Sequence, residues 1–412
     1  METEKLYYAD AFLTDFSAQV LSCEPNKGKY LVTLDRTAFY PEGGGQPADF
    51  GTLGGAAVSD VHERGGVIVH TCDAPLEVGA AVSGQIDRPR RFDHMQQHSG
   101  EHIISGILCE MFECDNVGFH LGADAVTIDY NTVIPWEGLL EAEARANAVI
   151  WADKPAEITF PAPEELERMT YRSKKALTGS VRIVTFPEAD RCACCGTHVR
   201  RAGQVGLVKV ISCQKFREGV RIEILCGKRA VDYLSAVFEQ DRAVGQRLSV
   251  KPTETLPAVE RLEAELAAVK EELTAREQEA FEALARERAG AGNVVLFRAP
   301  TRPDSARRLA DTVAKQCGGL AAVFAGQDGA GYVYALVRAD GAAFSVKDMN
   351  MALHGRGGGR GGFAQGSVQA ARVTPPVYDA FATSGMAFRR VVSAMAEIIV
   401  RLKVSFFMEI PP

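Results

Sequence analysis

Two clusters of histidine and cysteine, far apart in this sequence of 412 residues, constrain the fold more than any other feature. The first occupies residues 94–102 and the second occupies residues 191–198. Imidazole nitrogens and thiolate sulfurs are ligands of tetrahedral Zn²⁺ sites. A site that uses both clusters has to bring two separate elements of the chain together.

The first cluster lies on an expected helix, which Asp93 would cap and which would run to about Cys114. The imidazoles of His94, His98 and His102 are four residues apart on this helix and share one face. They cannot all bind one ion, because two helical turns separate the first from the third by roughly 12 Å. Spacing leaves the pairs 94/98 and 98/102 open, and it also fits histidines that bind nothing.

The second cluster offers thiols and an imidazole in a short run: Cys192, Cys194, Cys195 and His198. Cys194 and His198 are four residues apart, whereas Cys195 and His198 are three apart, and both spacings allow chelation. Together with one histidine pair, this run predicts a four-ligand zinc site. The alternative is a set of buried free thiols beside an exposed histidine.

A competing interpretation uses the first cluster alone. Residues 98–102 also read H-x-x-E-H, the pattern of inverted zinc peptidases, in which Glu101 would activate water. This enzyme alternative leaves the cysteine-rich run without a role.

The pattern along the chain predicts an α+β protein of four domains. Residues 1–87 carry β-branched runs between glycine and proline turns, as in a small β-barrel. Residues 88–245 mix helices and strands into an α/β core that holds both clusters. Residues 246–291 form a helical, coiled-coil arm, and residues 292–412 form a C-terminal α/β domain.

The arm is identified by apolar residues at alternating spacings of three and four. The series is Val259, Leu262, Leu266, Val269 and Leu273. It fits a coiled coil within or between chains, which could pair two copies of the protein. It fits a solvated helix that packs on its own domain equally well.

Two glycine-rich runs stand out. Gly43, Gly44 and Gly45, followed by Gln46, permit positive φ and a close backbone approach, or form a simple flexible turn. The run 354–362 lacks the lysine of a phosphate loop and the spacing of a dinucleotide loop. It predicts either a phosphate or nucleic-acid contact or a mobile surface loop.

Taken together, these motifs resemble a known family. Residues 37–47, 95–102 and 194–199 are similar, in order and rough spacing, to the editing module of alanyl-tRNA synthetase and its free-standing AlaX relatives. Residues 355–366 resemble the glycine-rich motif of the synthetase's C-terminal domain, which DHH phosphoesterases share. Because no class II aminoacylation domain fits ahead of the first motif and the DHH signature is absent, we expect the long AlaX form, which needs no ATP.

The resemblance implies a cytoplasmic, zinc-dependent hydrolase that deacylates mischarged tRNA(Ala). The expected substrates are chiefly Ser-tRNA(Ala), and also Gly-tRNA(Ala). It implies four zinc ligands, namely His98, His102, Cys194 and His198, with Cys194 preferred because the family pattern is Cys-x-x-x-His. Whether all four bind at once is left open by the sequence.

Further site residues follow from the same resemblance. Thr37 is the expected partner of the serine hydroxyl, although it also fits ordinary strand packing. The remaining candidates are Gly43, Gly44, Gly45 and Gln46 for substrate binding, Gln97 and Glu101 for catalysis, and Arg217, Arg221, Arg356 and Arg360 for tRNA. The C-terminal domain would bind tRNA or form a homodimer.

The net charge of −7, from 46 Lys and Arg and 53 Asp and Glu, argues against a nucleic-acid partner. The acidity is uneven. Residues 171–230 hold 13 basic and 4 acidic residues, a balance of +9, whereas residues 254–282 hold 3 and 9, a balance of −6. The basic window is compatible with tRNA, so a non-catalytic, zinc-stabilised RNA-binding module is a third alternative. No apolar run is long enough for a membrane span.

Overall fold

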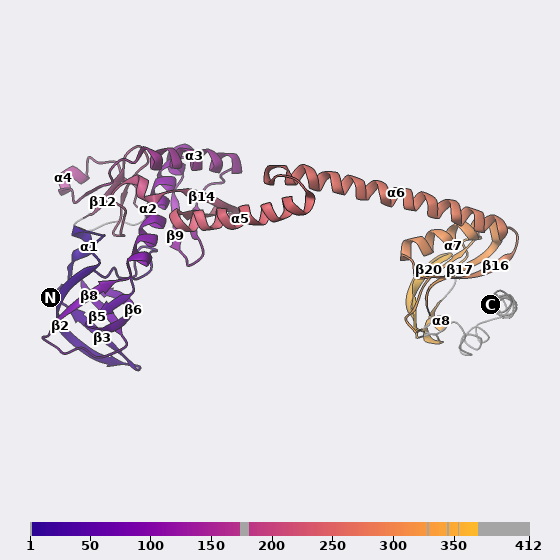
Figure 1. The fold of residues 1–412 in the computed structure, drawn as a ribbon, viewed down its shortest axis with the longest axis horizontal. Coiled ribbons are helices and arrows are strands. Elements are labelled where there is room, and N and C mark those ends of the chain that lie inside the picture. Colours follow the sequence, from indigo (N-terminus) through magenta and orange to yellow (C-terminus); the bar gives the residue numbers. More distant parts are fainter. Residues whose placement is uncertain (1, 174–180, 328, 344–345, 353, 370–412) are drawn as a thin grey trace. The chain divides into compact units, whose positions relative to one another are not determined.

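The computed structural model describes residues 2–369, except 174–180, 328, 344–345 and 353. The chain divides into two compact units, Met1–Pro252 and Thr253–Pro412 (Figure 1). Both mix helices and strands, so the α+β class is confirmed. The expected divisions at residues 87 and 291 stay predictions, and residues 370–412 of the expected C-terminal domain lie outside the described residues.

The first unit begins with a closed ring of six strands. Around the ring, every strand pairs antiparallel with its two neighbours. The order is β2 (Asp15–Asn26), β3 (Lys29–Leu34), β7 (Val67–Cys72), β6 (Ala56–Arg64), β5 (Gly51–Leu53) and β8 (Ala81–Ile86). Alternate residues of β2 and β7 are buried, which is why the apolar positions of these strands recur every second residue.

Short elements flank the ring. Strand β1 (Glu4–Lys5) pairs in parallel with β4 (Arg36–Thr37), and the short helix α1 (Leu6–Ala9) follows β1 directly.

Helix α2 (Arg88–Phe112) carries the first histidine cluster and is buried continuously from His94 to Leu108. Asp87, not Asp93, is its N-cap, since the Asp87 carboxylate accepts a hydrogen bond from the Arg90 amide at 3.1 Å. The expected start was therefore wrong by about two turns. Pro89 fits the first turn of this helix. Proline has no backbone N–H, and N–H groups in a first turn have no partner within the helix.

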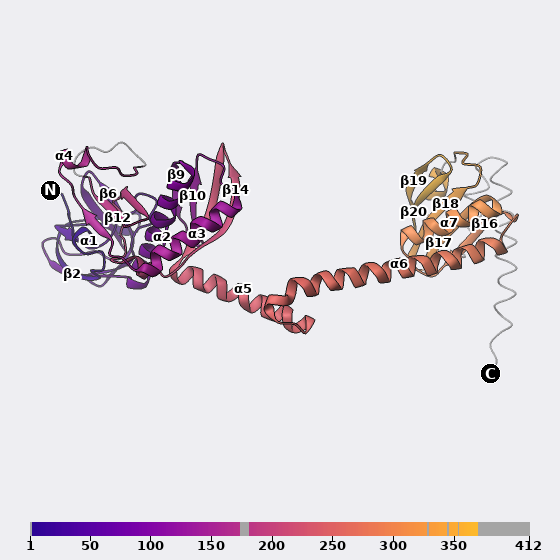
Figure 2. The same cartoon turned by 90° about the horizontal axis from the view of Figure 1, so that it is seen from above.

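A four-stranded sheet and helices surround α2. The sheet has the order β14 (Val208–Phe216), β15 (Gly219–Cys226), β10 (Val126–Tyr130), β9 (Asn116–Leu121). Helix α3 (Trp136–Ala152) lies against this sheet, as Figure 2 shows, and it also packs on α2. Helix α5 (Gly227–Leu248) continues directly from β15.

A small sheet supplies the second cluster. Its order is β11 (Glu157–Thr159), β12 (Ile183–Phe186), β13 (Asp190–Ala193). The helices α4 (Pro163–Leu166) and η1 (Ala202–Val205) follow β11 and β13 in the chain. Cys194 comes directly after β13, at the point where that strand reaches α2.

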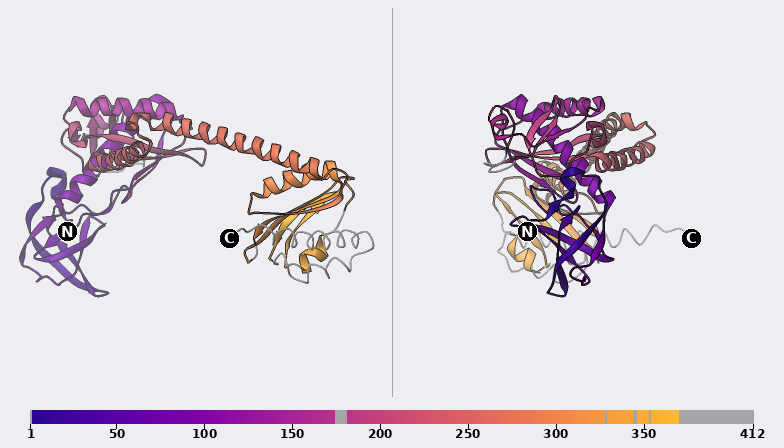
Figure 3. Two further views of the ribbon diagram at one scale, coloured as in Figure 1. Left: turned by 45° about the vertical axis from the view of Figure 1, so that its right-hand side comes forward. Right: turned by 90° about the vertical axis from the view of Figure 1, so that its left-hand side faces the viewer.

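The second unit contains the expected long helix, α6 (Thr255–Glu287), after the short η2 (Pro252–Glu254). Its five-stranded sheet has the order β16 (Gly292–Arg298), β17 (Gly318–Gln327), β18 (Gly331–Arg338), β20 (Phe363–Val368), β19 (Arg356–Arg360). Helix α7 (Pro303–Cys317) and the end of α6 pack on this sheet (Figure 3). The short α8 (Lys347–Ala352) precedes β19.

Two features of this unit bear on the sequence predictions. The apolar series from Val259 to Leu273 is exposed within the described part of the chain, so a coiled-coil partner stays a prediction. The interpretation of residues 354–362 as a surface loop was wrong, because Arg356–Arg360 forms edge strand β19. Glycine is required there: a Cβ on Gly359 would lie 1.8 Å from the Phe363 carbonyl oxygen.

None of the described helices is both long enough and apolar enough to span a membrane.

Candidate metal centre

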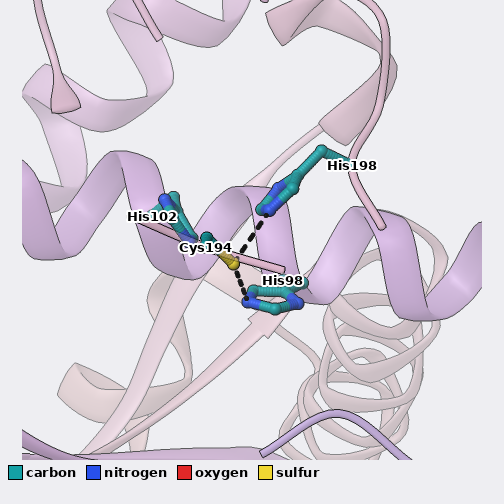
Figure 4. Close-up of side chains that lie close together, drawn as sticks. All are labelled: His98, His102, Cys194 and His198. Carbon is teal, nitrogen blue, oxygen red and sulfur yellow. Dashed lines mark hydrogen bonds between the residues drawn. The ribbon is translucent and has the colours of Figure 1, made fainter. Parts of the chain in front are cut away.

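The structure brings together four side chains from the two clusters (Figure 4). His98 and His102 project from one face of α2, one turn apart, while Cys194 and His198 come from the segment after β13. One ligand atom from each of the four lies within 4.8 Å of the others. His94, on the same helix, is not part of this group.

The distances fit a tetrahedral ion. The Cys194 Sγ atom lies 3.5 Å from His98 Nε2 and 3.4 Å from His198 Nε2. A sulfur and a nitrogen bound to one tetrahedral zinc ion at the usual bond lengths would be about 3.5 Å apart. The four residues therefore suit zinc in both donor chemistry and spacing.

Each imidazole is held by a partner at its other nitrogen. The His98 Nδ1 atom is hydrogen-bonded to Gln46 Oε1 at 2.8 Å, and His102 Nδ1 lies 2.9 Å from Asp190 Oδ2. The third contact joins His198 Nδ1 and Ser99 Oγ at 3.2 Å. Gln46 Oε1 and Asp190 Oδ2 can only accept, so the neutral rings of His98 and His102 carry their proton on Nδ1, and Nε2 is the nitrogen that can bind a metal ion.

Gln46 joins the ring to both ligand-bearing segments. Besides accepting from His98, its Oε1 atom accepts from the Thr197 amide at 3.2 Å, and its Nε2 atom donates to the Thr197 hydroxyl at 2.9 Å. Gln46 is fully buried. A single side chain thus ties the glycine-rich loop to α2 and to the loop of His198.

Two glycines allow this close approach. Gly45 has φ +87°, and a Cβ there would lie 2.5 Å from the ring of Phe119, which stacks on His98 with centroids 5.0 Å apart. A Cβ on Gly196 would lie 2.2 Å from Cε1 of His98. Larger residues at either position would displace His98, one of the four candidate ligands.

Asp190 is itself held in place. Its carboxylate accepts two hydrogen bonds from Arg172, at 2.7 and 2.9 Å, and approaches His102 with its second oxygen. Burial opposes ionisation, but His102 and Arg172 lower the pKa of Asp190. The carboxylate therefore stays charged beside the centre.

Electrostatics favour a thiolate at the centre. Burial would raise the pKa of Cys194, yet the three surrounding imidazoles hold it well below its usual value. Burial lowers the pKa of His198 to about 3. For His102, the contacts with Cys194 and Asp190 outweigh burial and raise the pKa to about 9.

The neighbouring cysteines have other environments. Cys195 is exposed and lies outside the group of four. Cys192 is buried, and burial raises its pKa, so it remains a thiol.

Thr37 is fully buried in β4, and its hydroxyl is already engaged. It accepts from the Phe39 amide at 3.1 Å and contacts His70 Nε2 at 2.8 Å. Because His70 Nδ1 faces the carbonyl oxygen of Val32 at 3.1 Å, that nitrogen carries the proton. Burial lowers the pKa of His70 to about 4, so the ring is neutral and Thr37 donates to Nε2.

Gln97 and Glu101, the two candidate catalytic side chains, form hydrogen bonds with groups outside the four candidate ligands. The Gln97 amide exchanges two hydrogen bonds of 2.8 Å with the backbone of Cys226. The buried Glu101 Oε1 atom accepts from Ser105 at 2.9 Å and from Asn116 at 2.6 Å.

The arginines expected to contact tRNA are dispersed. Arg217 is exposed in the turn between β14 and β15, and Arg221 pairs with Asp129 through two hydrogen bonds of 2.6 and 2.8 Å. Arg356 and Arg360 are exposed at the two ends of β19.

Asp190 and Ser99, the partners of two candidate ligand imidazoles, were not predicted from the sequence. One signal for Asp190 existed: Asp190, Cys192 and Cys194 are two residues apart, so an extended strand places them on one face. Ser99 offered no signal, because its contact depends on where the loop of His198 reaches α2.

Two models of known protein families match parts of this chain. The model described as tRNA synthetases class II (A) matches residues 2–90, and that of the threonyl and alanyl tRNA synthetase second additional domain matches residues 181–223. The first match includes the ring, and the second includes Cys194 and His198.

Curated relatives cover about 63% of this chain. The alanyl-tRNA editing protein AlaX-L of Pyrococcus horikoshii is 32% identical over 269 residues, and Aarsd1-A of Xenopus laevis, an alanyl-tRNA editing protein, is 31% identical over 277. The matched regions span 66% and 67% of these relatives. An alanine–tRNA ligase of Halobacterium salinarum is 35% identical over 279 residues, which are 30% of its length.

Proposed function

Since this chain belongs to the family of alanyl-tRNA editing proteins, we propose that it hydrolyses the ester bond of mischarged tRNA(Ala) in a zinc-dependent manner. Its principal substrate is Ser-tRNA(Ala), and Gly-tRNA(Ala) is a second one. The proposal rests mainly on one observation. The four potential zinc ligands are assembled beside the glycine-rich loop, through Gln46, within the unit that the family matches.

His98, His102, Cys194 and His198 would hold the ion. Bound zinc supplies a Lewis acid that can polarise a carbonyl oxygen or a water molecule. The chain contributes orientation: Gln46, Asp190 and Ser99 each hold one imidazole with Nε2 directed toward the centre. The buried Asp190 carboxylate also adds negative charge, which favours a cation there.

Selection of serine over alanine requires a polar partner for one hydroxyl group. Thr37 is the candidate, and its contacts define what it can offer. Its proton goes to His70 and one lone pair accepts from Phe39, so the other lone pair can accept from a serine hydroxyl. With alanine in the site, that lone pair stays unpaired. Correctly charged Ala-tRNA(Ala) is therefore bound less favourably than Ser-tRNA(Ala).

The tRNA itself would be bound electrostatically. Exposed Arg217 lies on the first unit and exposed Arg356 and Arg360 on the second, where they can contact phosphates. Arg221 already pairs with Asp129, so its contribution would be weaker.

The peptidase alternative is less well supported. It requires Glu101 to reach a zinc-bound water, but Glu101 is not in the group of four ligands, and its Oε1 atom contacts Ser105 and Asn116. A peptidase also gives Cys194 and His198 no role.

Deacylation of purified charged tRNA tests the proposal. The zinc-loaded protein should release serine from Ser-tRNA(Ala) much faster than alanine from Ala-tRNA(Ala). Equal rates or no release would refute it, and tRNA binding without release would favour the RNA-binding module. Cleavage of unfolded peptides that is lost in Glu101→Gln would favour the peptidase.

A matched pair of cysteine variants tests the ligand assignment in the same assay. Cys194→Ser should lose both bound zinc, measured by elemental analysis, and activity. Cys195→Ser, whose side chain is exposed, should retain both.

A further inference from the structure

Two aromatic side chains lie beside the metal centre without a role in it. Tyr8 of α1 and Phe160, which follows β11, meet edge to face, with ring centroids 6.2 Å apart and planes at 62°. Tyr8 is half-buried, whereas 51% of Phe160 is exposed. Phe160 therefore presents an aromatic face to solvent while Tyr8 holds its edge, so the face is open to a stacking ligand.

The Tyr8 ring is connected to the ligand loop by two contacts. Its hydroxyl lies next to the thiol of Cys195, the residue directly after the candidate ligand Cys194. The guanidinium of Arg182 lies 5.3 Å from the Tyr8 ring centroid and donates to the carbonyl oxygens of Cys194 and Gly196 at 2.8 and 3.0 Å. The aromatic pair is thus fixed relative to the centre.

Charge around the pair suits a phosphate-bearing ligand. Arg182 is buried, and its Nε atom has no hydrogen-bond partner among the described residues. A second cation, Lys5, lies 5.6 Å from the Tyr8 ring centroid and is paired with Glu63 at 2.7 Å, so Arg182 is the main source of positive charge. Aromatic rings flanked by cations are what proteins use to bind single-stranded nucleotides, the ring by stacking and the cation by charge.

From this geometry we infer that Tyr8 and Phe160 form the stacking site for the terminal base of the tRNA, the base whose ribose carries the aminoacyl ester. This inference rests on the proposed function. Only one ribose separates that base from the ester, so a base bound here brings the ester to the loop of Cys194 and His198. Stacking tolerates any base and adds affinity rather than sequence selectivity.

The most direct test uses mischarged tRNA(Ala) whose terminal adenine is replaced by 2-aminopurine, a base whose fluorescence falls when it stacks. Binding to the zinc-loaded full chain should quench the probe. Phe160→Ala should bind without comparable quenching, and Phe160→Tyr should restore it. Equal quenching in wild type and Phe160→Ala would overturn the inference.

Kinetics provide the second readout. In Phe160→Ala, the KM for Ser-tRNA(Ala) should rise about 5- to 150-fold, as expected for loss of one base–aromatic stack, with kcat nearly unchanged. Ile158→Ala is the matched control, because Ile158 is an exposed aliphatic residue on the adjoining strand β11. A KM in Phe160→Ala that equals the wild-type KM, or an equal rise in Ile158→Ala, would contradict a stacking site.

Failure of this inference is distinguishable from failure of the proposed function. If the wild-type protein deacylates Ser-tRNA(Ala) and Phe160→Ala has normal KM and quenching, only the stacking site is wrong. If the wild-type protein deacylates nothing, the proposed function is wrong whatever the probe reports.

Discussion

The side-chain oxygen of Gln46 lies 2.8 Å from Nδ1 of His98, across the junction between the six-stranded ring and helix α2. The contact links a loop of the ring to a candidate zinc ligand that is 52 residues further along the chain. The geometry of the centre therefore depends on how the ring docks.

Gln46→Ala should weaken zinc binding about 10- to 100-fold, the usual effect of removing a partner that orients a ligand imidazole. The loss should be measurable by competition with a chromophoric chelator. Gln85→Ala is the control, since the exposed Gln85 side chain donates to the exposed Asp15 at 3.0 Å. Unchanged zinc affinity in Gln46→Ala would show that His98 needs no partner from the ring.

The glycine-rich loop provides a matched pair of variants. Gly44 and Gly45 have φ of +60° and +87°, so alanine is strained at both, but only at Gly45 would a Cβ collide with Phe119. Gly45→Ala should therefore lower zinc affinity and deacylation strongly, because Phe119 stacks on His98. Gly44→Ala should lower thermal stability slightly and leave zinc affinity unchanged. Equal effects in the two would argue against close approach as the reason for glycine.

The ring is also tied to α2 by a buried ion pair between Arg91 and Asp49. The Arg91 Nε atom donates to both carboxylate oxygens at 3.0 Å, and the guanidinium also reaches the carbonyl oxygens of Ala11 and Ala38 at 2.7 and 2.6 Å. Both side chains are almost fully buried.

Removing one partner leaves an uncompensated buried charge, which typically costs about 3–5 kcal/mol. Asp49→Leu should destabilise the protein by that amount in denaturant unfolding. The double variant Asp49→Leu, Arg91→Met should recover a large part of the loss. If the double variant is as unstable as the sum of both single variants, the pair is not coupled.

The free energy of unfolding should decrease as the pH falls, and His70 should account for part of this decrease. Its pKa is about 4 in the folded protein and ordinarily 6.5, so between these values the unfolded chain binds the proton first. The contribution of His70 is full above pH 6.5 and is lost as the pH falls to 4, by about 3 kcal/mol in all.

His70→Gln should have a flatter stability profile than the wild type over this range, in urea unfolding at several pH values. Burial also lowers the pKa of His94 to about 4, but that contribution is present in both proteins and cancels in the comparison. Parallel profiles would show that His70 is not buried in its neutral form.

Much of the centre could be predicted from the sequence, because two of its determinants are local. The helical period alone places His98 and His102 one turn apart, and the short run after residue 191 keeps Cys194 near His198. The alternating spacing from Val259 to Leu273 likewise predicts α6 without tertiary information. Local backbone geometry suffices wherever the interacting residues are a few positions apart.

The tertiary structure decided what depends on contacts between distant segments. Local spacing left His94 and Cys195 as open candidates, whereas docking of β13 on α2 brings Cys194 to His98 and His102. The same docking supplies Asp190, and the ring supplies Gln46. The strand of Arg356–Arg360 exists because β20 pairs with it. Such contacts arise only when separate elements bury their surfaces together. A local pattern, such as the two-residue spacing of Asp190, Cys192 and Cys194, can place residues on one face but does not show which element that face meets.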